Sequence, residues 1–115
     1  MLPKSQRLNL KTDFKWVASG KKVESKFVKL FIRLGDNSYP RVGIATSSKT
    51  FKKATERNRA RRVISDSFES LYSKLPPSIN IVALPKQAIL EVKSGDVLLE
   101  LEKVLADEKI LTHSN

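Results

Sequence analysis

A long amphipathic helix in the middle of the chain constrains the fold most. We expect this helix to begin between Thr50 and Glu56 and to end near Lys74, because two prolines follow. One side of it is apolar at helical spacing and must pack on something, for which we expect a sheet. The apolar residues are Ala60, Ile64, Phe68, Leu71 and Leu75.

Three segments with strand patterns flank this helix. Residues 26–34 and 41–47 alternate in polarity, and the turn-like residues 35–38 between them predict an antiparallel hairpin. Residues 79–84 are apolar enough to form a buried strand. In the first strand, the face predicted to enter the core consists of Val28, Leu30, Ile32 and Leu34.

Two shorter helices complete the pattern. One begins at a polar cap formed by Thr12 and Asp13 and ends at Gly20, and another is capped by Ser94 or Asp96. The order helix, strand, strand, helix, strand, helix predicts an α+β fold, in which a small sheet of about four strands packs with helices as an α/β sandwich.

Length and composition indicate one domain over residues 1–115, with an ordered core at about 7–107 and flexible ends at 1–6 and 110–115. No apolar run approaches the length that spans a bilayer, and the first residues lack the apolar core of a signal peptide. The chain has no cysteine, which suits a reducing compartment. We therefore expect a cytoplasmic protein that does not bind membranes.

Positive charge is concentrated in two blocks. Residues 49–62 carry seven basic side chains and one acidic one, and residues 1–33 carry nine and two, whereas residues 86–115 have a net charge of −2. Such segregation predicts a positive face, and therefore a polyanionic partner. Nucleic acid is the expected partner. Binding to an anionic membrane would need a free apolar helix face, and here that face is needed for the core.

A helical wheel assigns different directions to the basic side chains of this helix. Asn58, Arg62 and Ser65 point away from the core, Arg59 and Arg61 flank it, and Arg57 falls back toward the core side at the helix start. Guanidinium groups suit phosphate because they offer several donors in one plane. The predicted nucleic-acid contacts are Lys49, Lys52, Lys53, Arg57, Asn58, Arg59, Arg61 and Arg62.

The second face of the first strand alternates rings with cations. Rings can stack on unpaired bases while cations hold phosphates. The alternative is that the N-terminal helix covers this face with Phe14 and Val17, and both arrangements can hold if the cover is partial. The residues of this face are Phe27, Lys29, Phe31 and Arg33.

Covalent catalysis by the chain alone is not expected. The single histidine, His113, is the third residue from the C-terminal end, and no cysteine or glycine-rich phosphate loop is present. Glu100 and Glu102 point to different helix faces, and no residues have the spacing of a metal site. We predict no catalytic residue and no metal ligand.

Together these features resemble the protein subunit of bacterial ribonuclease P. The family signature is an RNR triplet that continues as a basic helix, and residues 57–62 read RNRARR. The motif DF-x-x-V at residues 13–17 and PRVGIA at residues 40–45 fall in the expected order. The resemblance covers about Arg7 to Leu105.

This resemblance implies partners and a division of labour. The family's catalytic RNA subunit carries the active site and holds Mg²⁺, and the enzyme removes the 5′ leader of precursor tRNA. The protein is expected to be a monomer in a 1:1 ribonucleoprotein, with a left-handed βαβ crossover in a two-layer fold similar to ribosomal proteins. Its RNR face would meet the RNA, and a cleft walled by Phe14 and Val17 would hold the single-stranded leader.

Several positions depart from the family pattern. Ala18 stands where an aromatic residue is common, so that stacking would fall to Trp16 or Phe31. A cation is also missing at Ser48, at Ser65 and at the pair Leu84-Pro85.

Two other functions remain open at this stage. A structural protein of the ribosomal type would share the basic face but have no part in leader cleavage. A DNA-binding protein reading the major groove with residues 55–66 would call for a helix-turn-helix or a dimer, which the strand content opposes.

Overall fold

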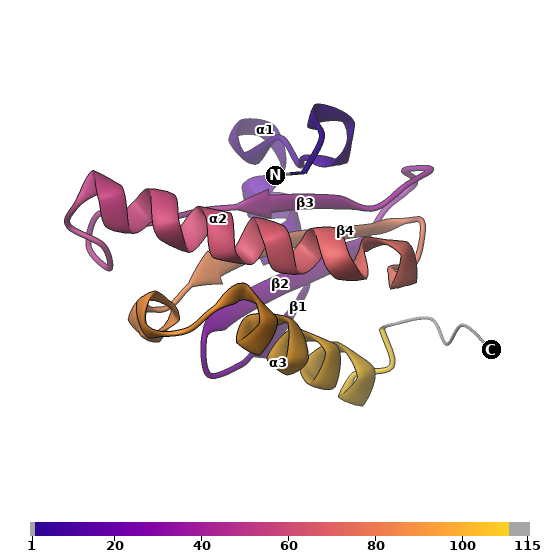
Figure 1. Ribbon diagram of the computed structural model, residues 1–115. Coiled ribbons are helices and arrows are strands. Elements are labelled where there is room, and N and C mark those ends of the chain that lie inside the picture. The colour runs from indigo at the N-terminus through magenta and orange to yellow at the C-terminus, as the bar shows by residue number, and fades with distance from the viewer. Residues whose placement is uncertain (1, 111–115) are drawn as a thin grey trace.

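The computed structural model describes residues 2–110 and has a four-stranded sheet with three α-helices (Figure 1). The α-helices are α1 (Leu10–Ala18), α2 (Ala54–Leu71) and α3 (Ser94–Asp107), and the strands are β1 (Lys21–Glu24), β2 (Val28–Leu34), β3 (Arg41–Ile44) and β4 (Ile79–Pro85). Short 3-10 helices are η1 (Lys4–Gln6), η2 (Tyr72–Lys74) and η3 (Gln87–Glu91). The α+β class is confirmed.

The sheet has the order β1-β2-β4-β3, and this order overturns the predicted hairpin. β4 lies between β2 and β3, antiparallel to the first and parallel to the second. Six of its seven residues are buried, because it is covered on both faces, and such a strand belongs in the middle of a sheet. β1 was not predicted, since it is short and mostly exposed.

Parallel β3 and β4 are joined through α2, so the expected βαβ crossover is present. The left hand that the family resemblance implies for this crossover stays a prediction. β3 ends at Ile44, earlier than the predicted 47, although the N–H of Ala45 still bonds to the carbonyl of Ala83 at 2.9 Å.

The main core lies between one face of the sheet and the two long helices. α2 and α3 lie side by side over that face (Figure 1). The sheet contributes Leu30, Ile81 and Ala83, and α2 contributes Phe68, as its apolar stripe predicts. Leu34, also predicted to enter the core, is 65% exposed because β2 ends there. Within residues 2–110 no helix is long and apolar enough to cross a membrane.

A smaller core lies on the opposite face, under α1. Successive β4 residues alternate between the two cores, so that Ile81 and Ala83 join the first and Val82 joins the second. Val17 of α1 is fully buried against Val82, and Phe14 packs beside it. α1 thus adds a partial third layer to the predicted two-layer fold.

The start of α1 differs from the prediction. Asn9 is the cap, and its side-chain oxygen accepts a hydrogen bond from the N–H of Lys11 at 3.1 Å. At the other end, a Cβ on Gly20 would clash with the carbonyl oxygen of Ile32. The two backbones approach so closely that only glycine fits at position 20.

The N-terminal residues contribute to the core, contrary to the expected flexible end. Leu2 is 3% exposed, and its N–H bonds to the Ser65 hydroxyl at 3.2 Å. The Arg7 Nε donates to the Leu2 carbonyl at 2.8 Å. At the other end Ile110 packs against the main core, and the rest of the predicted C-terminal tail lies outside the described residues.

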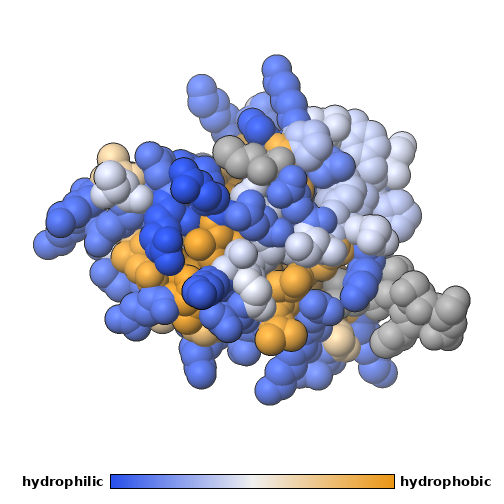
Figure 2. Space-filling model, viewed as in Figure 1, coloured by the Kyte–Doolittle hydropathy of each residue, from blue (hydrophilic) through white to orange (hydrophobic). Residues whose placement is uncertain are grey.

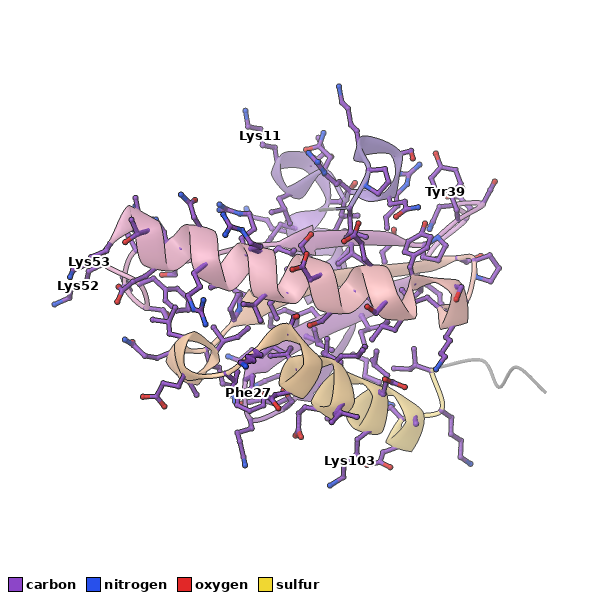
Figure 3. All side chains as sticks on the ribbon, in the orientation of Figure 1. Lys11, Phe27, Tyr39, Lys52, Lys53 and Lys103 are labelled. Carbon is purple, nitrogen blue, oxygen red and sulfur yellow. The ribbon has the colours of Figure 1, made fainter. Side chains whose placement is uncertain are left out.

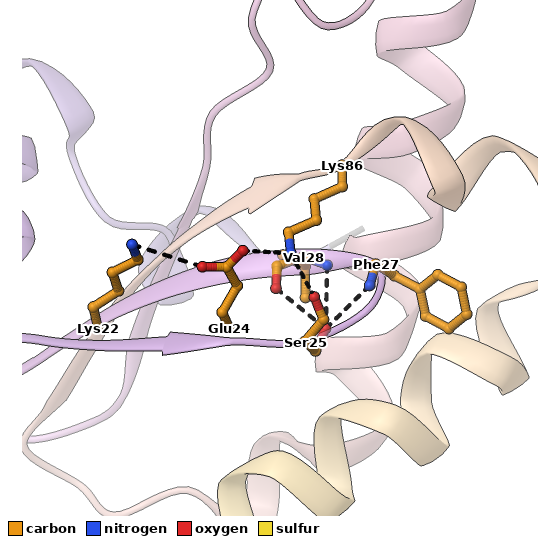
Figure 4. Close-up of polar contacts among 6 residues, drawn as sticks. All are labelled: Lys22, Glu24, Ser25, Phe27, Val28 and Lys86. Atoms are coloured by element: carbon orange, nitrogen blue, oxygen red, sulfur yellow. Dashed lines mark hydrogen bonds and ion pairs between the residues drawn. The ribbon is translucent and has the colours of Figure 1, made fainter.

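A polar cluster fixes the turn between β1 and β2 (Figure 4). The Ser25 hydroxyl accepts from the N–H groups of Phe27 and Val28. Lys86, after β4, donates to the Ser25 carbonyl at 2.8 Å and to the Glu24 carboxylate at 2.6 Å. The turn is thereby tied to the end of the central strand.

Candidate RNA interface

The lysines before α2 are held outward by a buried aromatic residue. Phe51 is fully buried, and its N–H bonds to the Ser47 carbonyl at 2.9 Å. The flanking Lys49, Lys52 and Lys53 are all exposed, and the last two project from one end of the molecule (Figure 3). Sequence reasoning missed Phe51 as the anchor, although an aromatic residue between lysines was a usable signal.

The one acid of the basic block is used to start the helix. Glu56 accepts a hydrogen bond from the backbone N–H of Lys53, with 3.4 Å between oxygen and nitrogen. A carboxylate at this position also interacts favourably with the positive end of the helix dipole. Glu56 therefore stabilises the helix start, and it takes part in none of the ion pairs described for residues 2–110.

Arg57 turns back toward the core side, as the helical wheel predicts. Its guanidinium Nη1 donates to the carbonyl of Phe51 at 2.8 Å and to that of Lys52 at 3.3 Å. The side chain thus fastens the loop that carries the lysines. One nitrogen of its guanidinium is committed to the protein, and the residue as a whole is partly exposed.

Arg59 and Arg61 flank α2 on opposite sides, again as predicted. Arg59 reaches toward the end of η3 and donates to the carbonyls of Leu90 and Val92, both at a long 3.4 Å. Arg61 reaches toward β3, where Nη2 donates to the Thr46 hydroxyl at 2.9 Å. The two arginines therefore widen the basic face on both sides of the helix.

Asn58 and Arg62 form the outermost part of this face, and both are exposed. The Asn58 side-chain oxygen accepts from Arg61 Nη1 at 3.4 Å, which leaves its amide N–H groups for a ligand. The Arg62 side chain makes no hydrogen bond or ion pair among those the structure describes for residues 2–110.

The positive charge of residues 49–62 is not neutralised within the described part of the chain. The four ion pairs described there join Lys21 to Glu108, Lys22 and Lys86 to Glu24, and Lys74 to Glu102. None involves the basic block. Hydrophilic side chains gather over the N-terminal half of α2 (Figure 2), so this surface has the electrostatics that a polyanion requires.

Ser65 does not belong to this surface, although the wheel assigned it there. It is 1% exposed, because Leu2 of the N-terminal segment lies against it and donates to its hydroxyl. The missing cation at this position therefore has a structural explanation: a long charged side chain would displace Leu2.

A second candidate surface lies where α1 meets the sheet. Phe14 and Phe31 are half-buried there and contact one cluster, together with the fully buried Val17. Lys29 and Arg33 alternate with Phe31 along β2 and are half-buried on the same side. The structure thus brings together five of the six predicted cleft residues, with Val17 as packing rather than as exposed wall.

Phe27 is the exception and corrects the predicted strand face. It lies before the first residue of β2, in the turn that Ser25 fixes, where the strict alternation of the strand does not extend. Its ring packs against the main core, on the side of α3 (Figures 3 and 4). It cannot stack on a ligand bound beside α1.

A small hollow lies beside the basic face of α2. It has a volume of about 190 Å³ and lies between the N-terminal segment, β3 and α2, with Arg61 and Leu10 in its wall. Gly43 allows the chain to pass close to β3 here, since a Cβ would lie 2.7 Å from Leu10 Cδ2. Arg61 therefore stands between the basic face of α2 and the α1 side of the sheet.

The other departures from the family pattern also have places in the structure. Leu84 packs in the cluster under α1, and Pro85 is buried opposite Val28 at the start of β2. Ser48 is exposed beside Lys49, and Ala18 is half-buried at the end of α1.

The geometry defines a class of protein: a small α+β domain with a βαβ crossover and an unneutralised basic helix, suited to a nucleic acid. The ribonuclease P family model matches residues 2–109. Ribonuclease P protein components from Blochmanniella pennsylvanica and Pseudanabaena sp. are 33% and 32% identical to the chain, over 90% and 100% of both sequences. The chain belongs to the ribonuclease P protein family.

Solved structures of this family have the same fold. A Staphylococcus aureus RNase P protein mutant with defective mRNA degradation activity superposes with a TM-score of 0.80 at 24% identity, covering 93% of this chain and 91% of that one. The RNase P protein from Thermotoga maritima gives a TM-score of 0.77 at 26% identity, covering 88% and 96%.

Proposed function

We propose that this protein binds the RNA subunit of ribonuclease P through the basic face of α2 and its preceding loop, and that the complex removes the 5′ leader of precursor tRNA. One observation carries the proposal: the seven cations of residues 49–62 have no ion-pair partner among the described residues. Family membership makes an RNA subunit the partner that this charge fits.

The arginines contribute to this binding in different ways. Arg62 offers a complete guanidinium to phosphate, whereas Arg57, Arg59 and Arg61 each use part of theirs to hold neighbouring segments in place. A face whose arginines are anchored in this way loses less side-chain entropy when RNA binds. The protein acts as a monomer in a 1:1 complex.

The single-stranded leader binds beside α1. Half-buried Phe14 and Phe31 offer ring edges to unpaired bases, and Lys29 and Arg33 offer charge to the phosphates on the same side of β2. Since Val17 and the inner parts of both rings are already buried, the leader contacts the margin of α1 and leaves the helix in place.

Catalysis belongs to the RNA in this proposal. No three His, Cys, Asp or Glu side chains of residues 2–110 come close enough together to hold a metal ion. Following the family resemblance, we assign Mg²⁺ to the RNA subunit, and the protein's residues bind and orient RNA. Phosphate neutralisation by the protein would lower the Mg²⁺ concentration at which the complex is active.

Reconstitution tests this function. The protein is mixed with the cognate RNA subunit at a Mg²⁺ concentration too low for the RNA alone, and cleavage of precursor tRNA at the mature 5′ end is measured. Cleavage that depends on the protein supports the proposal. If a ribosomal RNA fragment binds equally well and cleavage never appears, the protein is a structural RNA-binding protein instead.

Phe14→Leu and a melting curve test the leader surface. Loss of the ring should weaken binding of leader-bearing precursor tRNA about fivefold or more and leave binding of mature tRNA unchanged. Leucine keeps most of the packing on Val17, so the variant should remain folded. A folded variant that keeps the full preference for precursor would exclude this role of Phe14.

A further inference from the structure

A separate hollow lies between α1 and the loop that joins β2 to β3. It has a volume of about 500 Å³, within the range of ligand pockets. Its wall combines Asp13 and Trp16 of α1 with loop residues 36–39, Arg41 of β3 and Asn80 of β4. None of these residues belongs to the basic block of α2 or to the Phe14 cluster.

Two exposed aromatic rings line this hollow, and the guanidinium group of an arginine lies over each ring. Trp16 is 39% exposed and Tyr39 is 43% exposed. The Arg33 Cζ lies 4.9 Å from the centre of the Trp16 ring, and the Arg41 Cζ lies 5.7 Å from that of Tyr39. Figure 3 shows Tyr39 at the end of the molecule that carries the β2–β3 loop.

The position of Trp16 is fixed from two sides. Arg33 donates to the Trp16 carbonyl at 3.2 Å, in addition to covering its ring. Gly35 lies against the ring edge, since a Cβ there would be 2.9 Å from Trp16 Cη2. A larger residue than glycine would push the ring away, so the ring is held in place before any ligand arrives.

The loop opposite Trp16 is also held. The Asn37 amide donates to the Tyr39 carbonyl at 2.8 Å and to that of Ile79 at 3.2 Å. Asn80 in turn donates to the Asn37 side-chain oxygen at 2.9 Å. These bonds connect the loop to the central strand, so that binding costs little ordering of the protein.

The charged groups of the hollow are not used by the fold. Asp13 and Asp36 take part in none of the ion pairs described for residues 2–110. Arg41 contacts only the Tyr39 ring among the described interactions. The wall therefore presents stacking surfaces, a cation for phosphate, and carboxylates that accept from base N–H groups.

We propose that this hollow binds one unpaired nucleotide of single-stranded RNA. The base lies against Trp16 and Tyr39, its phosphate meets Arg41, and Asp13 or Asp36 accepts from its amino group. Guanosine, with two neighbouring N–H donors on one edge, is preferred over uridine, which has no amino group. The strand is the tRNA leader if the proposed function holds, and the hollow then selects a leader base away from the Phe14 surface.

Trp16 is the only tryptophan of the chain, so its fluorescence reports on the surroundings of one ring, and the variants below distinguish the hollow from the Phe14 surface. The full-length protein is titrated with hexanucleotides of uridine that contain one guanosine at each position in turn. Stacking should quench the emission, and the best guanosine strand should reach half-quenching at a concentration at least about fivefold below that of hexauridine. An abasic strand of the same charge should not quench.

Variants assign the effect to named groups. Tyr39→Leu and Arg41→Gln should each raise the half-quenching concentration about fivefold or more. Lys103→Gln removes one exposed charge from α3, far along the chain, and should leave it within twofold of the unchanged protein. The double variant Asp13→Asn, Asp36→Asn should bind both strands about equally. Circular dichroism checks that each variant is folded.

Each outcome bears on the hollow separately from the proposed function. No quenching at saturating RNA overturns the nucleotide site, whether or not the reconstituted complex prefers precursor tRNA. Quenching that the abasic strand reproduces, or that Tyr39→Leu and Arg41→Gln leave unchanged, overturns it as well. Specific quenching with no protein-dependent cleavage keeps the site and rejects the leader as its ligand.

Discussion

Replacing Arg57 and Arg62 one at a time by glutamine should separate two kinds of arginine on α2. Both lie in the basic block, but Arg57 donates to the carbonyls of Phe51 and Lys52, and Arg62 is exposed without a described hydrogen bond. Glutamine keeps a comparable helix propensity and removes the charge. The two variants therefore lose the same charge from different surroundings.

The expected magnitudes follow from these contacts. A hydrogen bond to a charged group contributes about 1.5–3 kcal/mol when it is shielded from water. Arg57 is only partly buried and one of its bonds is 3.3 Å long, so Arg57→Gln should lower the free energy of unfolding by about 1 kcal/mol. Arg62→Gln should change it by less than about 0.5 kcal/mol.

The affinity for RNA should also distinguish the two variants. The logarithm of affinity for the RNA subunit should fall against the logarithm of salt concentration with a slope of roughly −4 to −6, for about six phosphates at ~0.7–0.9 each. Arg62→Gln should make the slope shallower by about one such contact. Arg57→Gln should weaken binding further at every salt concentration, because the lysine loop also loses an anchor.

Urea denaturation of the isolated protein measures the free energy of unfolding, and a salt titration measures the affinity for RNA. Lys103→Gln, on the acidic C-terminal part, is the matched control and should change neither. If Arg57→Gln leaves the unfolding midpoint unchanged, the loop contacts do not stabilise the fold. If all three variants weaken RNA binding equally, the block acts as diffuse charge and the distinction between its arginines is wrong.

Three further results are expected. Gly43→Ala should lower the free energy of unfolding, measured in urea, by about 1–3 kcal/mol, because the added Cβ would meet Leu10. Gly95→Ala, with open space around it, should raise the free energy of unfolding by up to about 1 kcal/mol. Equal effects of the two substitutions would exclude the steric argument. Lys86 lowers the pKa of Glu24 below its usual 4.5 by donating a hydrogen bond to the carboxylate. The ion pair therefore stabilises the fold above pH 4.5, and this contribution is lost as the pH falls through the lower pKa of the folded state. Glu24→Gln should accordingly reduce Tm slightly near neutral pH and have no effect in strong acid, and a Tm difference that persists in acid would refute the ion pair as its cause. The isolated protein should cleave no RNA, and cleavage that survives repurification from nucleases would contradict this.

Much of the secondary structure could be predicted from the sequence because each pattern is local. The apolar stripe from Ala60 to Leu75 needs only the helical repeat to define its buried side, and β2 is recognisable from alternation alone. The directions of Arg57, Arg59 and Arg61 followed from the same wheel and are confirmed by their contacts. The wheel failed at Ser65 because another segment, not the helix itself, covers that position.

The sequence by itself determined which sides of the helices and strands are apolar and where the positive charge is concentrated. The tertiary structure decided what each side meets: β4 came between β2 and β3, and Phe27 turned to the main core. It also brought Trp16 and Tyr39, 23 positions apart in the chain, to one hollow. Periodicity reports a residue's own element, whereas strand order and shared surfaces depend on which distant faces bury each other best.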